Sequence, residues 1–155
     1  MKTKKTETLL LVDDTPSNID ILVELLADEY DLMVAMNGPA ALEIMHEELI
    51  DLVLLDIVMP EMDGYAVSEK MQDSPALCDI PVIFLTARSD EDSIEQAYAV
   101  GGIDYVTKPF KRNELLARIR THLRLRALIR EMEYLAQHDP LTGLFNRRHF
   151  FEVAT

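Results

Sequence analysis

Residues 51–60 read DLVLLDIVMP, and this stretch decides the fold class. The four residues before Asp56 are all apolar, with no alternation between polar and apolar positions. Such a run predicts a strand that is buried on both faces, as in a parallel sheet covered by helices. The run ends on Asp56, and burying a charge without a partner is costly. We therefore expect Asp56 to reach an edge of the sheet or to be paired there.

Strand-like and helix-like patterns alternate on both sides of this stretch. The predicted strands are residues 8–12, 31–35, 51–56, 80–87 and 103–107. The predicted helices begin at Pro16, at Asn37-Gly38-Pro39, after Gly64, and at a capping box formed by Ser89 and Asp92, whose helix ends at Gly101-Gly102. The alternation predicts a parallel α/β sheet with right-handed crossovers.

The composition is that of a soluble globular domain, with a net charge of −13 that is unevenly distributed. Residues 1–108 hold 6 Lys/Arg against 23 Asp/Glu, and residues 109–155 hold 9 against 5. The acidic first part should repel nucleic acid, and no apolar run is long enough to cross a membrane. The short N-terminal apolar run argues against a signal peptide. The single Cys78 excludes an internal disulfide and fits a reducing compartment, so we expect a cytoplasmic location. The sequence has no Cys/His spacing typical of a metal site, so we expect no zinc.

A long helical pattern follows Pro109, from Lys111 to about Gln137, without Gly or Pro. Its first part could cover the sheet through Leu115, Leu116, Ile119 and Leu123. Further along, Leu125, Leu128, Met132 and Leu135 recur at spacings of three and four, which resembles a short coiled-coil seam. The alternative is a helix packed on its own domain. The basic residues are most simply a solvated face: Arg118, Arg120, Arg124, Arg126 and Arg130.

Acidic and phosphate-binding residues gather at the predicted strand ends. Asp13 and Asp14 follow the first strand, Asp56 ends the third, Thr86 ends the fourth and Lys108 follows the fifth. Ligands of parallel α/β sheets bind beyond these ends. Three close carboxylates raise one another's pKa values, and an all-oxygen set suits Mg²⁺. Aspartate is also a phosphoryl nucleophile, and a lysine suits a phosphoryl oxygen, so the set predicts phosphoryl transfer onto a carboxylate.

Each of these residues has a simpler interpretation when it is taken alone. Asp13-Asp14 could be a helix cap, Thr86 a strand-end residue and Lys108 an ordinary surface lysine. Their coincidence at the ends of separate strands favours the phosphoryl site.

The motifs LVDDTP, LLDIVMPEMDG, FLTA and DYVTKPF resemble those of the response-regulator receiver domain of two-component signalling. The resemblance covers residues 7–125 and implies a five-stranded, parallel, doubly wound sheet of the flavodoxin-like, CheY-like type. It also implies that Asp56 accepts a phosphoryl group from a histidine kinase or phosphotransfer protein. A bacterial source follows from the same resemblance.

The resemblance implies roles for the neighbouring residues as well. Asp13, Asp14, Asp56 and the backbone carbonyl of Val58 would bind Mg²⁺, and Thr86 and Lys108 would contact the phosphoryl group. Thr86 and Tyr105 would form a switch that remodels the surface of the fourth helix, fifth strand and fifth helix. Without the resemblance, Tyr105 would be a half-buried strand tyrosine. Three further expectations are a cis Lys108-Pro109 peptide, tuning of the phosphoryl lifetime by Val58 and Arg88, and a departure at Gly102, where the family more often has alanine.

Residues 138–150 read HDPLTGLFNRRHF, which resembles the opening of the GGDEF diguanylate cyclase domain. The expected organisation is a receiver domain at 7–125, a helical linker at 126–137 and an incomplete GGDEF start at 138–155. The GTP-binding and metal-binding residues of a cyclase are absent, so this chain should not itself make cyclic di-GMP. His138 and His149 fit no single helical face and are expected to be surface residues.

These observations favour an input module that controls a downstream cyclase, with two chains pairing through the extended helix or through the fourth-helix, fifth-strand and fifth-helix face. A transcription regulator that contacts DNA through the arginines is a second reading, but no helix-turn-helix follows. A phosphoryl shuttle or hydrolase for small phosphates is a third, and the sequence indicates no substrate pocket for it.

Overall fold

The computed structural model describes residues 7–87 and 91–138. Five strands and five helices alternate along these residues. The strands are β1 (Thr8–Val12), β2 (Asp31–Ala35), β3 (Leu52–Asp56), β4 (Val82–Thr86) and β5 (Asp104–Thr107). The helices are α1 (Pro16–Leu26), α2 (Gly38–Glu47), α3 (Gly64–Gln72), α4 (Glu91–Ala99) and α5 (Arg112–His138).

The strands form one parallel sheet in the order β2-β1-β3-β4-β5. This confirms the predicted five-stranded doubly wound sheet. The predicted strand at 80–87 was too long: β4 begins only at Val82, because Ile80 is still in a turn that its backbone N–H closes on the Leu77 carbonyl. The predicted capping box includes Ser89, which lies outside the described residues.

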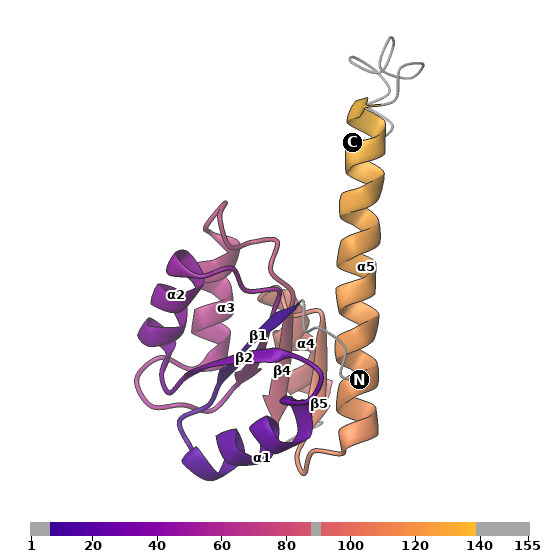
Figure 1. Ribbon diagram of the computed structural model, residues 1–155. Coiled ribbons are helices and arrows are strands. Elements are labelled where there is room, and N and C mark those ends of the chain that lie inside the picture. The colour runs from indigo at the N-terminus through magenta and orange to yellow at the C-terminus, as the bar shows by residue number, and fades with distance from the viewer. Residues whose placement is uncertain (1–6, 88–90, 139–155) are drawn as a thin grey trace. The chain divides into compact units, whose positions relative to one another are not determined.

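Helices cover both faces of this sheet, and alternate strand residues contact different layers. One core cluster joins Leu10, Val53 and Phe84 to residues of α2, α3 and α4. Figure 1 shows α2 and α3 side by side in that layer. The intervening strand residues, such as Leu11 and Leu54, are also buried. So are one face of α1 and one face of the first turns of α5, formed by Ile19, Leu22, Leu26, Leu115, Leu116 and Ile119. β3 is therefore buried at every position, as the run LVLLD predicts.

The central helices begin at side-chain caps. Asn37 Oδ1 accepts a hydrogen bond from the Ala40 N–H at 2.8 Å, and Asp63 Oδ1 accepts one from the Ala66 N–H at 2.9 Å. These bonds satisfy N–H groups that have no partner within the helix. They fix where α2 and α3 begin, and α3 begins directly after the loop that leaves Asp56.

The end of α4 explains the glycine at position 102. Gly101 has a φ of 98°, a left-handed conformation that favours glycine. A Cβ atom on Gly102 would lie 2.5 Å from a ring carbon of Phe84. The Phe84 ring thus occupies the space that an alanine methyl group would need.

The chain divides into two compact units, Met1–Arg120 and Thr121–Thr155, and α5 runs through the division. In the first unit Leu115, Leu116 and Ile119 of α5 are buried, as predicted for the part of the helix that covers the sheet, whereas Leu123, in the second unit, is only half-buried. The described part of the second unit is the rest of α5. Its stripe of Leu125, Leu128, Met132 and Leu135 is exposed. Within the part of the chain that the structure describes, no helix has the length and apolar character needed to span a membrane.

Among the arginines of α5 that were predicted to form a solvated face, Arg118 is half-buried, so the prediction was wrong for it, whereas Arg120 is exposed as predicted. Arg118 donates to both carboxylate oxygens of Asp104, at 2.8 and 3.0 Å. Arg120 pairs with Glu29 at 3.3 Å. The hydrogen bond to Asp104 raises the pKa of Arg118, so its positive charge is retained at any pH of interest. These pairs fasten the first turns of α5 to β5 and to the end of α1.

Candidate functional site

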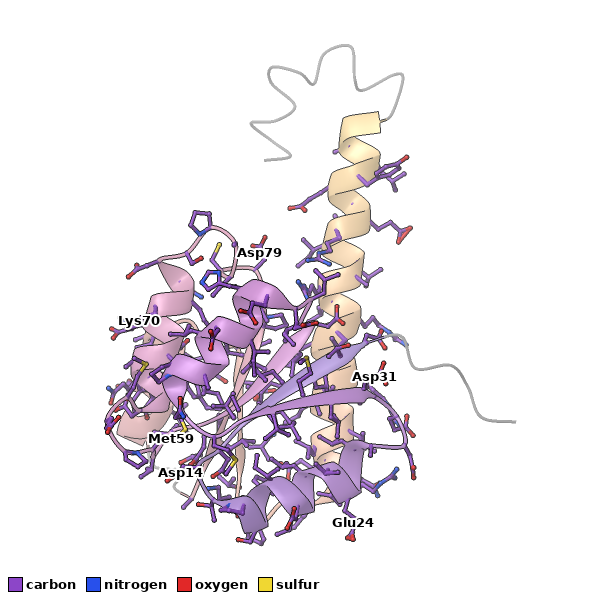
Figure 2. All side chains as sticks on the ribbon, turned by 60° about the vertical axis from the view of Figure 1, so that its left-hand side comes forward. Asp14, Glu24, Asp31, Met59, Lys70 and Asp79 are labelled. Atoms are coloured by element: carbon purple, nitrogen blue, oxygen red, sulfur yellow. The ribbon has the colours of Figure 1, made fainter. Side chains whose placement is uncertain are left out.

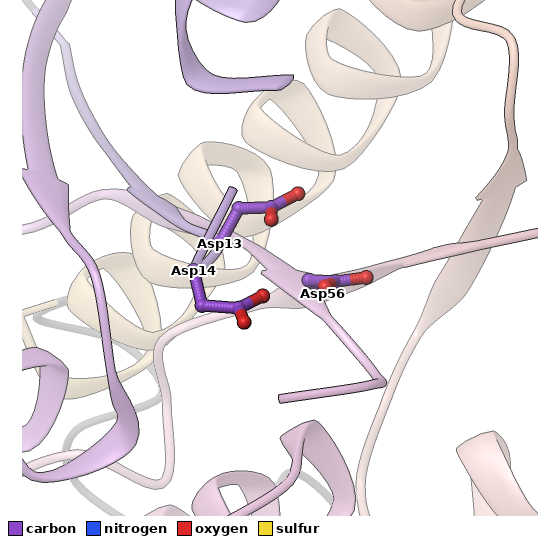
Figure 3. Close-up of side chains that lie close together, drawn as sticks. All are labelled: Asp13, Asp14 and Asp56. Atoms are coloured by element: carbon purple, nitrogen blue, oxygen red, sulfur yellow. The ribbon is translucent and has the colours of Figure 1, made fainter. Parts of the chain in front are cut away.

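Three carboxylates meet at the carboxyl end of the sheet (Figure 3). One oxygen from each of Asp13, Asp14 and Asp56 can be chosen so that all three lie within 4.8 Å of one another. Asp13 and Asp56 are buried and Asp14 is half-buried. Figure 2 shows Asp14 at the same end of the strands as Met59, whereas Asp31 marks the opposite end. The structure therefore brings together the acidic groups that the sequence predicts.

The register of the central strands produces this meeting. β1 and β3 run parallel with Val12 opposite Leu55. One residue further along, Asp13 and Asp56 leave their strands side by side. Because both strands are buried along their length, their first polar residues are carried to the same edge. Asp56 is only 4% exposed, so it reaches the edge of the sheet without reaching bulk solvent.

Gly64 allows α3 to approach the phosphoacceptor candidate closely. Its N–H donates to the Ile57 carbonyl at 2.8 Å. A Cβ atom at this position would lie 2.4 Å from the Asp56 carbonyl oxygen, so only glycine fits. The sequence pattern predicts a helix start at Gly64 but gives no sign of this close backbone approach.

Lys108 supplies the positive charge of the site. Its Nζ lies 3.1 Å from Asp56 Oδ1 and 3.8 Å from Asp13 Oδ2. Its backbone N–H donates to the Thr86 carbonyl at 2.8 Å, which holds the end of β5 against the end of β4. The Lys108-Pro109 peptide is cis, as expected. Lys108 is therefore part of the cluster and not an isolated surface lysine.

The pKa of Asp56 is raised above its ordinary value. Burial is the largest cause, and the negative charge of Asp13 is the next. The hydrogen bond and charge of Lys108 act in the opposite direction. The crowding of three carboxylates predicts raised pKa values from mutual repulsion. For Asp56 the direction is confirmed, but desolvation contributes more than its neighbours do.

Two hydrogen bonds hold the Asp13 carboxylate. Oδ1 accepts from the Thr15 N–H at 2.9 Å, and Oδ2 accepts from Asn18 Nδ2 at 3.1 Å. Asn18 was missed at the sequence level. The signal available was its place in the first turn of the helix that follows Asp13-Asp14, five residues after Asp13.

Of the remaining predicted residues, Thr86 and Val58 lie at or beside this edge, and Tyr105 lies further back in the sheet. Thr86 is the last residue of β4, is 8% exposed, and stands next to Thr107 of β5. Tyr105 is half-buried and lies opposite Phe84 in the sheet. The Val58 side chain is 77% exposed in the loop after β3. Arg88 and residues 139–155, including His149 and most of the GGDEF-like segment, lie outside the described residues.

The donor set fits a hard divalent cation. Carboxylate oxygens from three residues converge, and two of these residues are buried, where an unbalanced negative charge is costly. Mg²⁺ prefers oxygen ligands of this kind and shares its coordination with phosphate groups.

Comparisons with known proteins agree with the fold. Residues 9–120 match the response regulator receiver domain. A probable cyclic di-GMP phosphodiesterase from Vibrio cholerae is 46% identical over 116 residues, covering 75% of this chain and 26% of that protein. The response regulator PleD from Caulobacter vibrioides is 38% identical over 125 residues, covering 80% of this chain and 28% of that protein. The chain thus spans about a quarter of the length of either relative.

Two solved structures show the same fold at similar coverage. The receiver domain of a sensor histidine kinase from Pseudomonas aeruginosa PAO1 has a TM-score of 0.71 and 28% identity, covering 76% of this chain and 97% of that one. That domain was solved with a magnesium ion coordinated in its active site cleft. The signal receiver domain of a histidine kinase from Syntrophus aciditrophicus has a TM-score of 0.71 and 32% identity, covering 77% and 91%.

Proposed function

The chain belongs to the response-regulator receiver domain family, and on that premise we propose that Asp56 is its phosphoryl acceptor. The observation that carries the proposal is the meeting of Asp56 with two further aspartates and a lysine at the carboxyl end of the sheet. Within this group, Asp56 is the last residue of β3, the central strand of the sheet.

In the proposed reaction an Asp56 carboxylate oxygen attacks the phosphorus of a phosphohistidine on a histidine kinase or phosphotransfer protein. The new P–O bond forms as the P–N bond breaks, and the bonding pair stays on the ring nitrogen of the departing histidine. The product is an aspartyl phosphate, a mixed anhydride. The attacking carboxylate must be deprotonated, so the raised pKa of Asp56 opposes the reaction and the Lys108 charge favours it.

Asp13, Asp14 and Asp56, together with the backbone carbonyl of Val58, are the proposed ligands of Mg²⁺. The bound ion would offset the crowded negative charge and the charge on the phosphoryl oxygens. Lys108 would hold a phosphoryl oxygen by its positive charge, and the Thr86 hydroxyl would donate to another.

The proposed output is a rearrangement of the α4-β5-α5 surface. Thr86 turns toward the phosphoryl group, and Tyr105 moves into the space that it leaves. Tyr105 is half-buried and packs against the core cluster that contains Phe84, which supports its assignment as the moving residue. The alternative role, a static strand tyrosine, predicts no change in its environment when Asp56 is phosphorylated.

We propose that the regulated activity is cyclic di-GMP synthesis by a GGDEF domain in the bacterial cytoplasm. The support is the segment HDPLTGLFNRRHF after α5, within the proposed organisation 7–125, 126–137 and 138–155. Pairing of two chains through the exposed stripe of α5 would place two such domains together. A second candidate output is cyclic di-GMP degradation, which the name of the Vibrio cholerae relative favours.

Labelling with a small phosphodonor tests the acceptor assignment. The full chain, Asp56→Asn and Asp20→Asn are incubated with acetyl phosphate and Mg²⁺, and the added mass is measured on intact protein. Asp20 is an exposed residue of α1 and serves as the control. We expect labelling of the wild type and of Asp20→Asn and none of Asp56→Asn. Persistent labelling of a folded Asp56→Asn variant would refute the assignment. In a separate experiment, retention of the wild-type protein on DNA at moderate salt would favour the alternative hypothesis of a transcription regulator.

A further inference from the structure

We propose that Asn18 is a positioning residue of the metal site, whose side-chain amide holds the Asp13 carboxylate ready to bind the divalent cation. The inference rests on the proposed function, in which Asp13 is a metal ligand. Asn18 lies in α1, outside the acidic motifs and the strand ends that predict the other residues of the site.

The two donors to Asp13 act on different oxygens. The Thr15 N–H is 2.9 Å from Oδ1, and Asn18 Nδ2 is 3.1 Å from Oδ2. Bonds to both oxygens fix the rotation of the carboxylate group as well as its position. Asp13 has no exposed surface, so its carboxylate depends on protein donors for hydrogen bonds. The backbone donor remains in any variant, whereas the second donor depends on the identity of residue 18.

An amide is well suited to this position beside three acidic groups. Lys108 Nζ lies 3.8 Å from Oδ2, which is beyond hydrogen-bond distance. An ionised carboxylate has about four lone-pair sites, so the bond from Asn18 leaves Oδ2 able to bind a cation. A lysine or arginine would add a positive charge that competes with the cation. An aspartate would add a fourth negative charge and, when ionised, would donate nothing. Asn18 therefore supplies orientation without changing the charge of the site.

A purely structural role for Asn18 makes a different prediction. Asn18 lies in the first turn of α1, where the Thr15 side chain makes no capping bond. The bond to Asp13 could simply tether the start of the helix. A tether predicts lower stability of the variants without a selective loss of cation affinity. A positioning residue predicts weaker cation binding by the folded protein and recovery of labelling when the cation is saturating.

The test compares Asn18→Leu and Asn18→Ala with the wild type in the full chain. Leucine is close in size to asparagine and donates no hydrogen bond. Ser17→Ala is the matched control, since Ser17 is the exposed neighbour in the same turn. Magnesium affinity is measured by isothermal titration calorimetry, stability by urea unfolding in EDTA, and Asp56 labelling as a function of Mg²⁺ concentration.

We expect both Asn18 variants to bind Mg²⁺ about 10- to 100-fold more weakly, with a wild-type labelling rate at saturating Mg²⁺ and an unaffected Ser17→Ala control. Wild-type Mg²⁺ affinity in a folded Asn18 variant would overturn the inference and leave the proposed function intact. If the wild type itself binds no Mg²⁺, the proposed function and the inference both fail. If neither Asn18 variant folds, Asn18 is a structural tether and the inference is wrong.

Discussion

Lys108 Nζ lies 3.1 Å from Asp56 Oδ1, although the two residues are 52 positions apart in the chain. The lysine follows an edge strand and the aspartate ends the central one. The strand between them, β4, accepts the Lys108 backbone N–H through the Thr86 carbonyl at 2.8 Å. The side chain therefore starts from a fixed point and reaches across one strand to the buried carboxylate.

Lys108→Met should slow labelling of Asp56 by about a hundred-fold, the usual effect of removing a preorganised charge-stabilising donor. Methionine keeps an apolar stem of similar length and removes the charge. Without Lys108 the pKa of Asp56 rises further, so the loss should be larger at acidic than at neutral pH. Intact-protein mass spectrometry over time measures the rate. Lys70→Met, at an exposed lysine of α3, should label normally.

Asp56→Asn should stabilise the protein at neutral pH when no divalent cation is present. The raised pKa of Asp56 means that the folded state binds this proton more tightly than the unfolded state does. Between the two pKa values the folded state holds more protons, so stability falls as pH rises through that window. An asparagine at position 56 does not titrate, so the Asp56→Asn variant does not lose stability in this way as pH rises. Urea unfolding in EDTA from acid to neutral pH should show a difference from wild type that grows with pH, and a pH-independent difference would contradict the assignment of cause.

Gly64→Ala should destabilise the protein by about 1 to 3 kcal/mol, the usual cost of overpacking. The added methyl group would lie 2.4 Å from the Asp56 carbonyl oxygen, and a backbone atom cannot move aside cheaply. Gly38→Ala is a matched control at the first residue of α2. Its Cβ would meet Met62 Sδ at 2.7 Å and Val67 Cγ2 at 2.9 Å, which belong to side chains and not to the backbone. Urea unfolding should show a much lower free energy of unfolding for Gly64→Ala than for Gly38→Ala. Equal losses of stability in the two variants would refute this explanation.

Arg118→Met should cost about 1 kcal/mol, the upper range for a partly exposed ion pair. The variant keeps much of the apolar stem and removes two hydrogen bonds to Asp104. Asp104 also accepts the Tyr105 N–H at 2.8 Å, so the backbone next to the proposed switch should become more mobile. Urea unfolding gives the first effect and hydrogen exchange at Tyr105 the second. Arg124→Met, at an exposed residue of the same helix, should change neither.

Leu128→Lys should prevent pairing of two chains through α5. Leu128 is 48% exposed and lies within the stripe of the second unit. A lysine there would place like charges at the seam, so we expect the dissociation constant to rise at least about tenfold. Light scattering with and without a beryllofluoride mimic at Asp56 measures the mass. Ala127→Lys adds the same charge beside the stripe and should pair as wild type does. If the mimic leaves the mass of the wild type unchanged, the hypothesis that phosphorylation controls dimerisation is wrong.

Much of the fold could be predicted from local patterns. DLVLLD reads as a doubly buried strand because both sheet faces are covered by helices. The breaks at Gly38-Pro39 and at Gly101-Gly102 mark helix boundaries because proline fixes φ at a value that suits the first turn of a helix, whereas glycine also accepts the left-handed conformation found at helix ends. The start of β4 was predicted two residues early, since Ile80 is apolar but its N–H is used in a turn.

By itself, the sequence determined which groups gather at the carboxyl end of the sheet, because strand direction and buried length dictate where the first polar residues emerge. Only the tertiary structure decided what each group contacts: Lys108 with Asp56, Asn18 with Asp13, Gly64 against the Asp56 carbonyl, and Arg118 with Asp104. Periodicity specifies which face a residue belongs to. Distances between elements depend on how every side chain packs at once, and no short stretch of sequence encodes that.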